Sequence, residues 1–189
     1  IEVKNLSNEK WFLIDGNSLI YRTFYALPPL TTSKGVHTGA IRGFTTILLK
    51  IINEEKPDYI GVAFDKRTPT IRHEYYEEYK AGRLKMPEDL AVQIPLLKAI
   101  LEAFGIKIIS LDGYEADDLI GTLSKYGEEK GIEVKIITGD RDDYQLASDL
   151  TTIWYTKKGI SEFDAVDQQE IYKKYGITPQ ELIDVKGLM

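Results

Sequence analysis

The stretch IKIISLDGYEADDLIGTLSKYGEEKGIEVKIIT, residues 106–138, shows the pattern on which the chain is built. The apolar run at residues 106–111 predicts a buried strand, and residues 115–130 predict a helix that ends at Gly131. A second apolar run at residues 133–138 predicts another strand. A strand, a helix and a strand in succession favour a right-handed crossover between parallel strands, and hence an α/β fold.

The same alternation continues in both directions along the chain. Further strands are predicted at residues 11–14, 59–64, 152–156 and 160–163, the last after a turn at Lys158-Gly159. Helices are predicted at residues 19–27, 41–52, 90–104, 141–146, 167–175 and 179–185. We therefore expect an α/β fold with a mainly parallel central sheet that is flanked by helices.

Composition excludes several classes of protein. The 189 residues, 43% apolar and 29% charged, suit one globular domain, or one domain plus part of another, and no run is long enough to cross a membrane. Cysteine is absent, which excludes disulfides and thiolate metal sites and favours a cytoplasmic setting. With only two histidines, any metal should be bound by oxygen, which indicates Mg²⁺, Mn²⁺ or Ca²⁺.

Carboxylates gather where predicted strands end. Asp15, Asp65 and Asp140 each follow such a strand, and the carboxyl ends of parallel strands meet at one edge, where ligands bind. A helix that begins at the same edge carries three more acids in its first turn, and a further one follows Asp140 by two residues. The predicted metal ligands are Asp15, Asp65, Glu115, Asp117, Asp118, Asp140 and Asp142.

Each of these acids alone has a plain structural explanation. Acidic residues are favoured in the first turn of a helix by its dipole, and aspartate is common in turns. The whole set is harder to explain in this way, because so much negative charge at one place is destabilising without cations. It suits two divalent ions about 4 Å apart, as in metal-assisted phosphodiester hydrolysis.

Residues 66–86 have a different character. Apolar periodicity fades, and basic residues are interleaved with tyrosine and histidine: Lys66, Arg67, Arg72, His73, Tyr75, Tyr76, Tyr79, Lys80, Arg83 and Lys85. By itself the segment could be a solvated surface in which Glu74, Glu77 and Glu78 pair with the cations. Beside a metal site, cations that bind phosphates and rings that stack on bases favour a nucleic-acid lid. The net charge of −6 argues only weakly against this, because acids and bases are clustered apart.

Several motifs resemble one family. They are Ile14-Asp15-Gly16-Asn17-Ser18 with Tyr21-Arg22, Arg72-His73-Glu74, Tyr79-Lys80-Ala81-Gly82-Arg83, Gly113-Tyr114-Glu115-Ala116-Asp117-Asp118 and Thr138-Gly139-Asp140-Arg141-Asp142. The chain is similar to the flap-endonuclease family, and within it to the 5′-nuclease domains of bacterial type I DNA polymerases. The resemblance implies a PIN-like α/β domain over residues 1–189. It also implies a helical arch at about residues 66–86, through which a 5′ single strand passes.

The resemblance also implies roles for the site residues. Asp15, Asp65, Glu115 and Asp117 would serve a first metal, with Asp118 alongside, and Asp140 and Asp142 would lie between it and a second metal. Lys80 and Arg83 would act as catalytic cations of the arch. The residues expected to contact DNA are Tyr21, Arg22, Arg72, Lys80 and Arg83.

The implied function is that of a structure-specific 5′ nuclease that uses two Mg²⁺ or Mn²⁺ ions. Its substrates would be DNA flaps, nicks and RNA primers, and it would act as a nucleoid-associated cytoplasmic monomer, with a polymerase domain attached in a longer protein. The alternative is a metal- and DNA-binding fragment without turnover. A nucleotide-sugar transferase built on Asp140-Arg141-Asp142 would explain neither the acids near Glu115 nor the basic segment.

Two departures from the family are visible. The chain stops before the family's Gly-Asp-x-x-Asp-Asn motif and its helix–hairpin–helix, so further ligands of the second metal and the grip on duplex DNA are expected to be missing. Asp143 occupies a position where the family usually carries an apolar residue. It could pack poorly or add an oxygen ligand, but we expect it to face solvent without a role.

Overall fold

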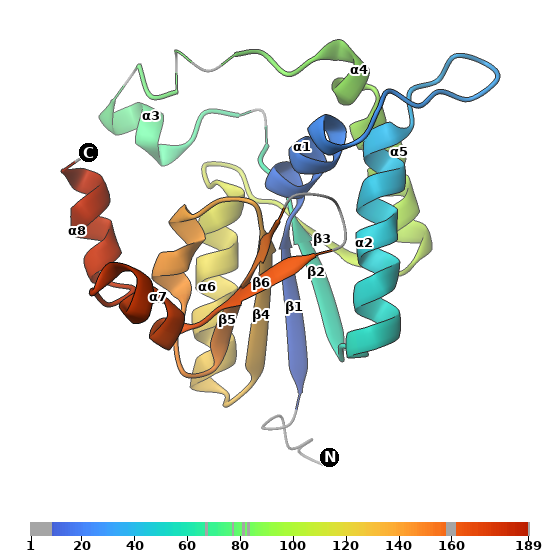
Figure 1. Ribbon diagram of the computed structural model, residues 1–189. Coiled ribbons are helices and arrows are strands. Elements are labelled where there is room, and N and C mark those ends of the chain that lie inside the picture. Colours follow the sequence, from blue (N-terminus) through green and yellow to red (C-terminus); the bar gives the residue numbers. More distant parts are fainter. Residues whose placement is uncertain are drawn as a thin grey trace, which may run out of the picture.

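A mixed six-stranded sheet in the order β3-β2-β1-β4-β5-β6 forms the centre of the molecule (Figure 1). The computed structural model describes residues 9–66, 68–76, 78–80, 82, 84–157 and 162–188. The first five strands are parallel, and β6 is antiparallel to β5. The strands are β1 Lys10–Asp15, β2 Tyr59–Ala63, β3 Lys107–Ile109, β4 Glu133–Thr138, β5 Thr151–Thr156 and β6 Phe163–Val166.

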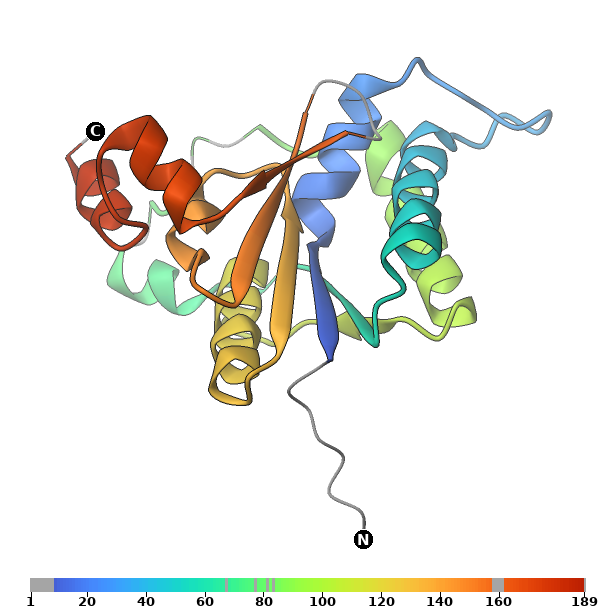
Figure 2. The same cartoon turned by 60° about the horizontal axis from the view of Figure 1, so that its bottom comes forward.

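Helices cover both faces of this sheet (Figures 1 and 2). One face is covered by α1 Gly16–Ala26, α2 Gly39–Glu55, α4 Glu88–Ala91 and α5 Gln93–Ala103. The other is covered by α6 Ala116–Glu129, the 3₁₀ helix η2 Asp142–Leu146, α7 Gln168–Tyr175 and α8 Glu181–Gly187. The short helix α3 Ile71–Tyr75 lies in the segment that joins β2 to α4, over the carboxyl edge of the sheet.

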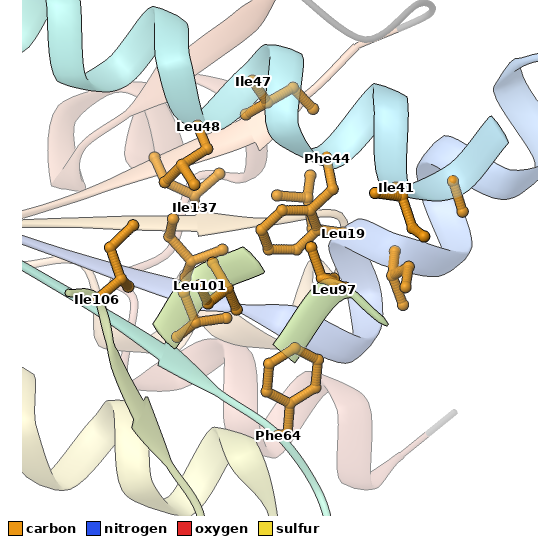
Figure 3. Packing of buried hydrophobic residues seen from close by; sticks show 14 of the residues in the cluster. Leu19, Ile41, Phe44, Ile47, Leu48, Phe64, Leu97, Leu101, Ile106 and Ile137 are labelled. Carbon is orange, nitrogen blue, oxygen red and sulfur yellow. The ribbon is translucent and has the colours of Figure 1, made fainter. Parts of the chain in front are cut away.

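Alternating side chains of each strand enter two apolar cores. Phe12 and Ile14 of β1 belong to the cluster under α1, α2 and α5. Figure 3 shows Phe44 and Leu97 of the same cluster. Leu13, between Phe12 and Ile14 in sequence, packs in the cluster on the opposite face. Because side chains of a strand point alternately to the two faces, a central strand buried on both sides reads as a continuous apolar run.

The predicted α/β fold with a mainly parallel sheet is confirmed, with local differences. The helix predicted at residues 90–104 is divided at Val92 into α4 and α5, because Pro95 has no N–H to donate to the carbonyl of Ala91. The segment after Asp140 forms a 3₁₀ rather than an α-helix. The last strand lies at Phe163–Val166, and the turn predicted at Lys158-Gly159 lies outside the described residues. Among the described helices, none has the length and apolarity of a membrane span.

Two adjacent leucines of α2 test the core. Leu48 is fully buried, whereas Leu49 is 39% exposed. We expect Leu48→Ala to lower the free energy of unfolding by about 2–5 kcal/mol, because it removes buried methyl groups and leaves a cavity. The matched control Leu49→Ala should change it by less, roughly 1 kcal/mol or below. Chemical denaturation measures both, and equal losses would contradict this assignment of the buried face.

Candidate metal centre

Asp15 stands at the junction of β1 and α1, at the carboxyl edge of the sheet. It is 4% exposed, and its Oδ1 accepts a hydrogen bond of 2.9 Å from the backbone N–H of Ser18, as the N-cap of α1. Gly16 follows, and a Cβ there would lie 2.7 Å from the carbonyl oxygen of Ala63. This close approach between the turn and β2 requires glycine, and it fixes Asp15 at the inner end of the site.

Asp117 and Asp143 converge on Asp15 from two other elements. One carboxylate oxygen of each of the three residues lies within 4.8 Å of the others. Asp117 comes from the first turn of α6 and Asp143 from η2. The expectation that Asp143 faces solvent is wrong, because its side chain is buried at 1% exposure beside Tyr144 and Ala147, which enter the core.

The three carboxylates have raised pKa values. Burial raises the pKa of Asp15 to about 7, and repulsion from Asp117, Asp65 and Asp140 adds to the effect. Burial together with repulsion from Asp117 raises the pKa of Asp143 to about 8. Asp117 is an exposed residue, but the protein around its carboxyl group removes part of its water. This partial burial, together with repulsion from Asp140 and Asp65, raises the pKa of Asp117 to about 6.

This arrangement fits a hard divalent cation. The donors are all carboxylate oxygens, which Mg²⁺ and Ca²⁺ prefer, and the three repel one another without a cation between them. Within the described part of the chain, Oδ2 of Asp143 is buried and has no hydrogen-bond partner. A bound cation would satisfy this oxygen and offset the repulsion.

Asp65 and Asp140 lie close to this group. Oδ1 of Asp65 accepts a 2.7 Å hydrogen bond from the backbone N–H of Ala116, which connects the end of β2 to the start of α6. Oδ1 of Asp140 accepts a 2.9 Å bond from the backbone N–H of Asp142. The charge of Asp140 acts on Asp15, Asp117 and Asp143, which places it at the same edge.

Asp118 and Asp142 are engaged elsewhere. The guanidinium of Arg72 binds both oxygens of Asp118, at 2.7 and 2.8 Å, and this pairing lowers the pKa of Asp118. Oδ2 of Asp118 also accepts a 2.9 Å bond from the backbone N–H of Glu115, which caps α6. Asp142 is exposed and forms an ion pair with Lys186 of α8. Neither residue joins the group of three around Asp15.

Glu115 connects the site to the basic segment above it. Glu115 is 7% exposed as a whole residue, and its Oε1 lies 2.6 Å from Nζ of Lys80. The hydroxyl of Tyr79 donates to Oε2 at 3.3 Å, and Nη1 of Arg72 lies 3.6 Å from the same oxygen. Lys80 adopts a left-handed backbone conformation with φ of 61°. Arg83, predicted to act with Lys80, lies outside the described residues.

Tyr21 and Arg22 lie on α1, six and seven residues beyond Asp15, which corresponds to roughly 10 Å of helix. Nη2 of Arg22 donates to the backbone carbonyl of Lys157 at the end of β5. The ring of Tyr21 stacks on Tyr25 with centroids 6.5 Å apart. The structure therefore brings Arg72 and Lys80 to the acidic site but leaves these two residues at some distance from it.

Sequence reasoning missed two contributors. The sequence gives Tyr79 no role of its own, although its hydroxyl contacts Glu115 directly. The sequence pattern also predicts a surface position for Asp143, which is buried. A signal for Asp143 lies in the resemblance, which implies an apolar residue at this position, and apolar positions are usually buried.

The fold and the site define a mainly parallel α/β domain with an acidic carboxyl edge beneath a basic segment. The chain belongs to the 5′-3′ exonuclease family, because residues 10–176 match the model of that family's N-terminal resolvase-like domain. The predicted resemblance to 5′ nucleases is therefore confirmed.

Two comparisons with curated proteins agree with this family membership. The chain is 49% identical over 181 residues to DNA polymerase I of Bacillus subtilis, and the alignment covers 96% of this chain and 21% of that protein. It is 44% identical over 178 residues to DNA polymerase I of Mycobacterium tuberculosis, covering 93% of this chain and 20% of that protein. The chain thus spans about one fifth of the length of these relatives.

Solved structures share the fold. A bacteriophage T5 5′-exonuclease with bound zinc ions matches with a TM-score of 0.71 at 19% identity, over 94% of this chain and 65% of that one. A bacteriophage T5 flap endonuclease in a product-like complex with DNA and metal ions matches with a TM-score of 0.71 at 18% identity. The match covers 96% of this chain and 66% of that one. These similarities confirm the PIN-like nuclease fold.

The pair between Arg72 and Asp118 should hold α3 onto α6. We expect Arg72→Ala to raise hydrogen exchange at the backbone amides of α3, because a bidentate charge-assisted contact is lost. The control Arg42→Ala alters an exposed arginine of α2 and should leave α3 unchanged. Mass-spectrometric exchange of metal-free protein measures this, and unaltered protection of α3 in Arg72→Ala would mean that other contacts anchor the segment.

Proposed function

We propose that this chain is the catalytic core of a divalent-cation-dependent, structure-specific 5′ nuclease. The observation that carries the proposal is the convergence of three carboxylates, two of them buried, on one point under a basic segment, in a chain of the 5′-3′ exonuclease family. The T5 relatives, which hold metal ions and in one case DNA, support both ligands. We expect two Mg²⁺ ions, or Mn²⁺ in their place.

The carboxylates divide between the two ions. The first ion is held, directly or through water, by Asp15, Asp65, Glu115 and Asp117. Asp118 supports them, because it accepts hydrogen bonds from the backbone N–H of Glu115 and from the guanidinium of Arg72. Asp140 and Asp142 lie toward the second ion, and Asp142 must exchange its partner Lys186 to reach it. When bound, such ions polarise a phosphodiester and activate water.

The basic segment acts on the substrate. Residues 66–86 form the arch, and Lys80 and Arg83 stabilise the negative charge that develops on the phosphate. In the structure Lys80 pairs with Glu115, so a bound cation would release Lys80 toward a phosphate. Arg72, Tyr21 and Arg22 contact the 5′ strand of a flap, nick or RNA primer. We expect a monomer that works on nucleoid DNA and is followed by a polymerase domain in a longer protein.

Cleavage of a labelled 5′-flap duplex with Mg²⁺ tests the metal ligands. We expect Asp117→Asn and Asp140→Asn each to slow cleavage by about 100-fold or more, because fixed charges at such sites supply much of the stabilisation of the transition state. The control Asp149→Asn, an exposed aspartate that accepts a hydrogen bond from Gln168, should cleave as wild type does. Undiminished cleavage by either site variant removes that residue from the ligand set.

The alternative is a module that binds metal and DNA without turnover. It predicts salt-sensitive binding to flap DNA and no product, even at high concentrations of Mn²⁺. The same assay on wild type separates the two functions, since efficient cleavage excludes the alternative.

Substitution of Lys80 tests whether this residue stabilises the transition state or only binds a phosphate. We expect Lys80→Ala to lower the single-turnover cleavage rate by roughly 100-fold while flap affinity falls far less, because its contact matters most in the transition state. The matched control Lys107→Ala lies at the amino end of β3, away from the site, and should affect neither quantity. Equal losses in rate and affinity would make Lys80 a simple phosphate anchor.

A further inference from the structure

When it is ionised, the carboxylate of Asp143 has a charge that no ion pair within the described residues compensates. Its side chain is 1% exposed, and its Oδ2 has no hydrogen-bond partner within the described residues. The hydroxyl of Thr138 has one proton and donates it to Oδ2 of Asp15 at 3.4 Å. The neighbouring carboxylates of Asp117, Asp15 and Asp140 repel the charge of Asp143.

The basic side chains of the site are committed to other acids. Lys80 pairs with Glu115, and Arg72 pairs with Asp118, both on the outer side of the carboxylate group. Lys186 pairs with Asp142 on the surface of η2. No ion pair is formed by Asp15, Asp117 or Asp143 in the part of the chain that the structure describes. The inner group thus lacks the counter-charge that the outer acids have.

We propose that Asp143 is a direct ligand of a divalent cation that it holds together with Asp15 and Asp117. The inference rests on the proposed function of a metal-dependent nuclease and assigns an additional ligand to its metal site. Two oxygens on opposite sides of one Mg²⁺ lie about 4.2 Å apart, twice the bond length of ~2.1 Å. The oxygens of the three carboxylates already lie within 4.8 Å of one another, so only a small contraction is needed.

Asp143 would reach the ion from a different element than Asp15 and Asp117 do. Asp143 belongs to η2, Asp15 to the end of β1 and Asp117 to the start of α6, so one ion connects three separate elements. A third carboxylate adds attraction for a doubly charged ion and satisfies the unpartnered oxygen. Cation binding should therefore be tight and should stabilise the native fold, because the unfolded chain does not hold these groups together.

The competing explanation is a neutral, protonated carboxyl group that only fills space. Asparagine has nearly the shape of that protonated form and no charge, so Asp143→Asn separates the two explanations. A space-filling acid is replaced at no cost to metal binding, whereas a ligand is not.

The experiment titrates the chain with Mn²⁺ in the absence of DNA, by calorimetry and by thermal unfolding. Even residues that only support metal ligands cost about 10–100-fold in affinity when mutated, so Asp143→Asn should weaken Mn²⁺ binding by at least about tenfold. It should also lose most of the rise in Tm that Mn²⁺ causes in wild type. Asp149→Asn, which makes the same chemical change on the surface, should match wild type in both measurements.

The outcomes separate this inference from the proposed function. If wild type binds Mn²⁺ and Asp143→Asn binds it equally well, the inference fails and the proposed function stands. If wild type binds no Mn²⁺, both fail. Should Asp143→Asn not fold, a wild-type crystal with Mn²⁺ decides the question by its anomalous signal. An Asp143 oxygen about 2 Å from the ion supports the inference, and a separation beyond roughly 3 Å overturns it.

Discussion

The repulsion among Asp15, Asp117 and Asp143 is the constraint on which the rest of the site depends. Apolar cores hold the sheet on both faces, and one of them also holds α6 and η2, so these carboxylates cannot move apart to relieve the repulsion. Burial and mutual repulsion raise the pKa of each, which means that the metal-free site takes up protons where it lacks cations. The stability of the cores thus maintains a site that is itself unfavourable until a cation binds.

The protein supplies counter-charge to only part of the acidic edge. Arg72 and Lys80 neutralise Asp118 and Glu115, on the side that faces the basic segment. These contacts place the cations beside the metal centre, where a phosphate would enter, and the acids they hold are those that a metal would also attract. A bound metal would compete with Arg72 and Lys80 for these acids, and a phosphate would compete with the acids for Arg72 and Lys80. The position of the basic segment is therefore coupled to what is bound.

The sequence predicted the fold well because two signals coincided: continuous apolar runs for strands buried on both faces, and acidic turns where those strands end. It could not resolve the directions of neighbouring side chains. Asp117 and Asp118 differ by about 100° around a helix, enough to send one to Asp15 and the other to Arg72. Nor did it show the division at Val92 or the 3₁₀ form of η2, which depend on a single proline and on tertiary packing.

Asp143 shows how the same pattern can be misinterpreted. A charged residue in a polar sequence suggests the surface, yet Asp143 is buried beside Tyr144 and Ala147 of the core. A carboxylate in such a place is tolerated only if something compensates its charge. The fold has placed it beside Asp15 and Asp117, where a divalent cation would satisfy all three groups at once. The proposed coordination of a cation would therefore account for its unpartnered oxygen.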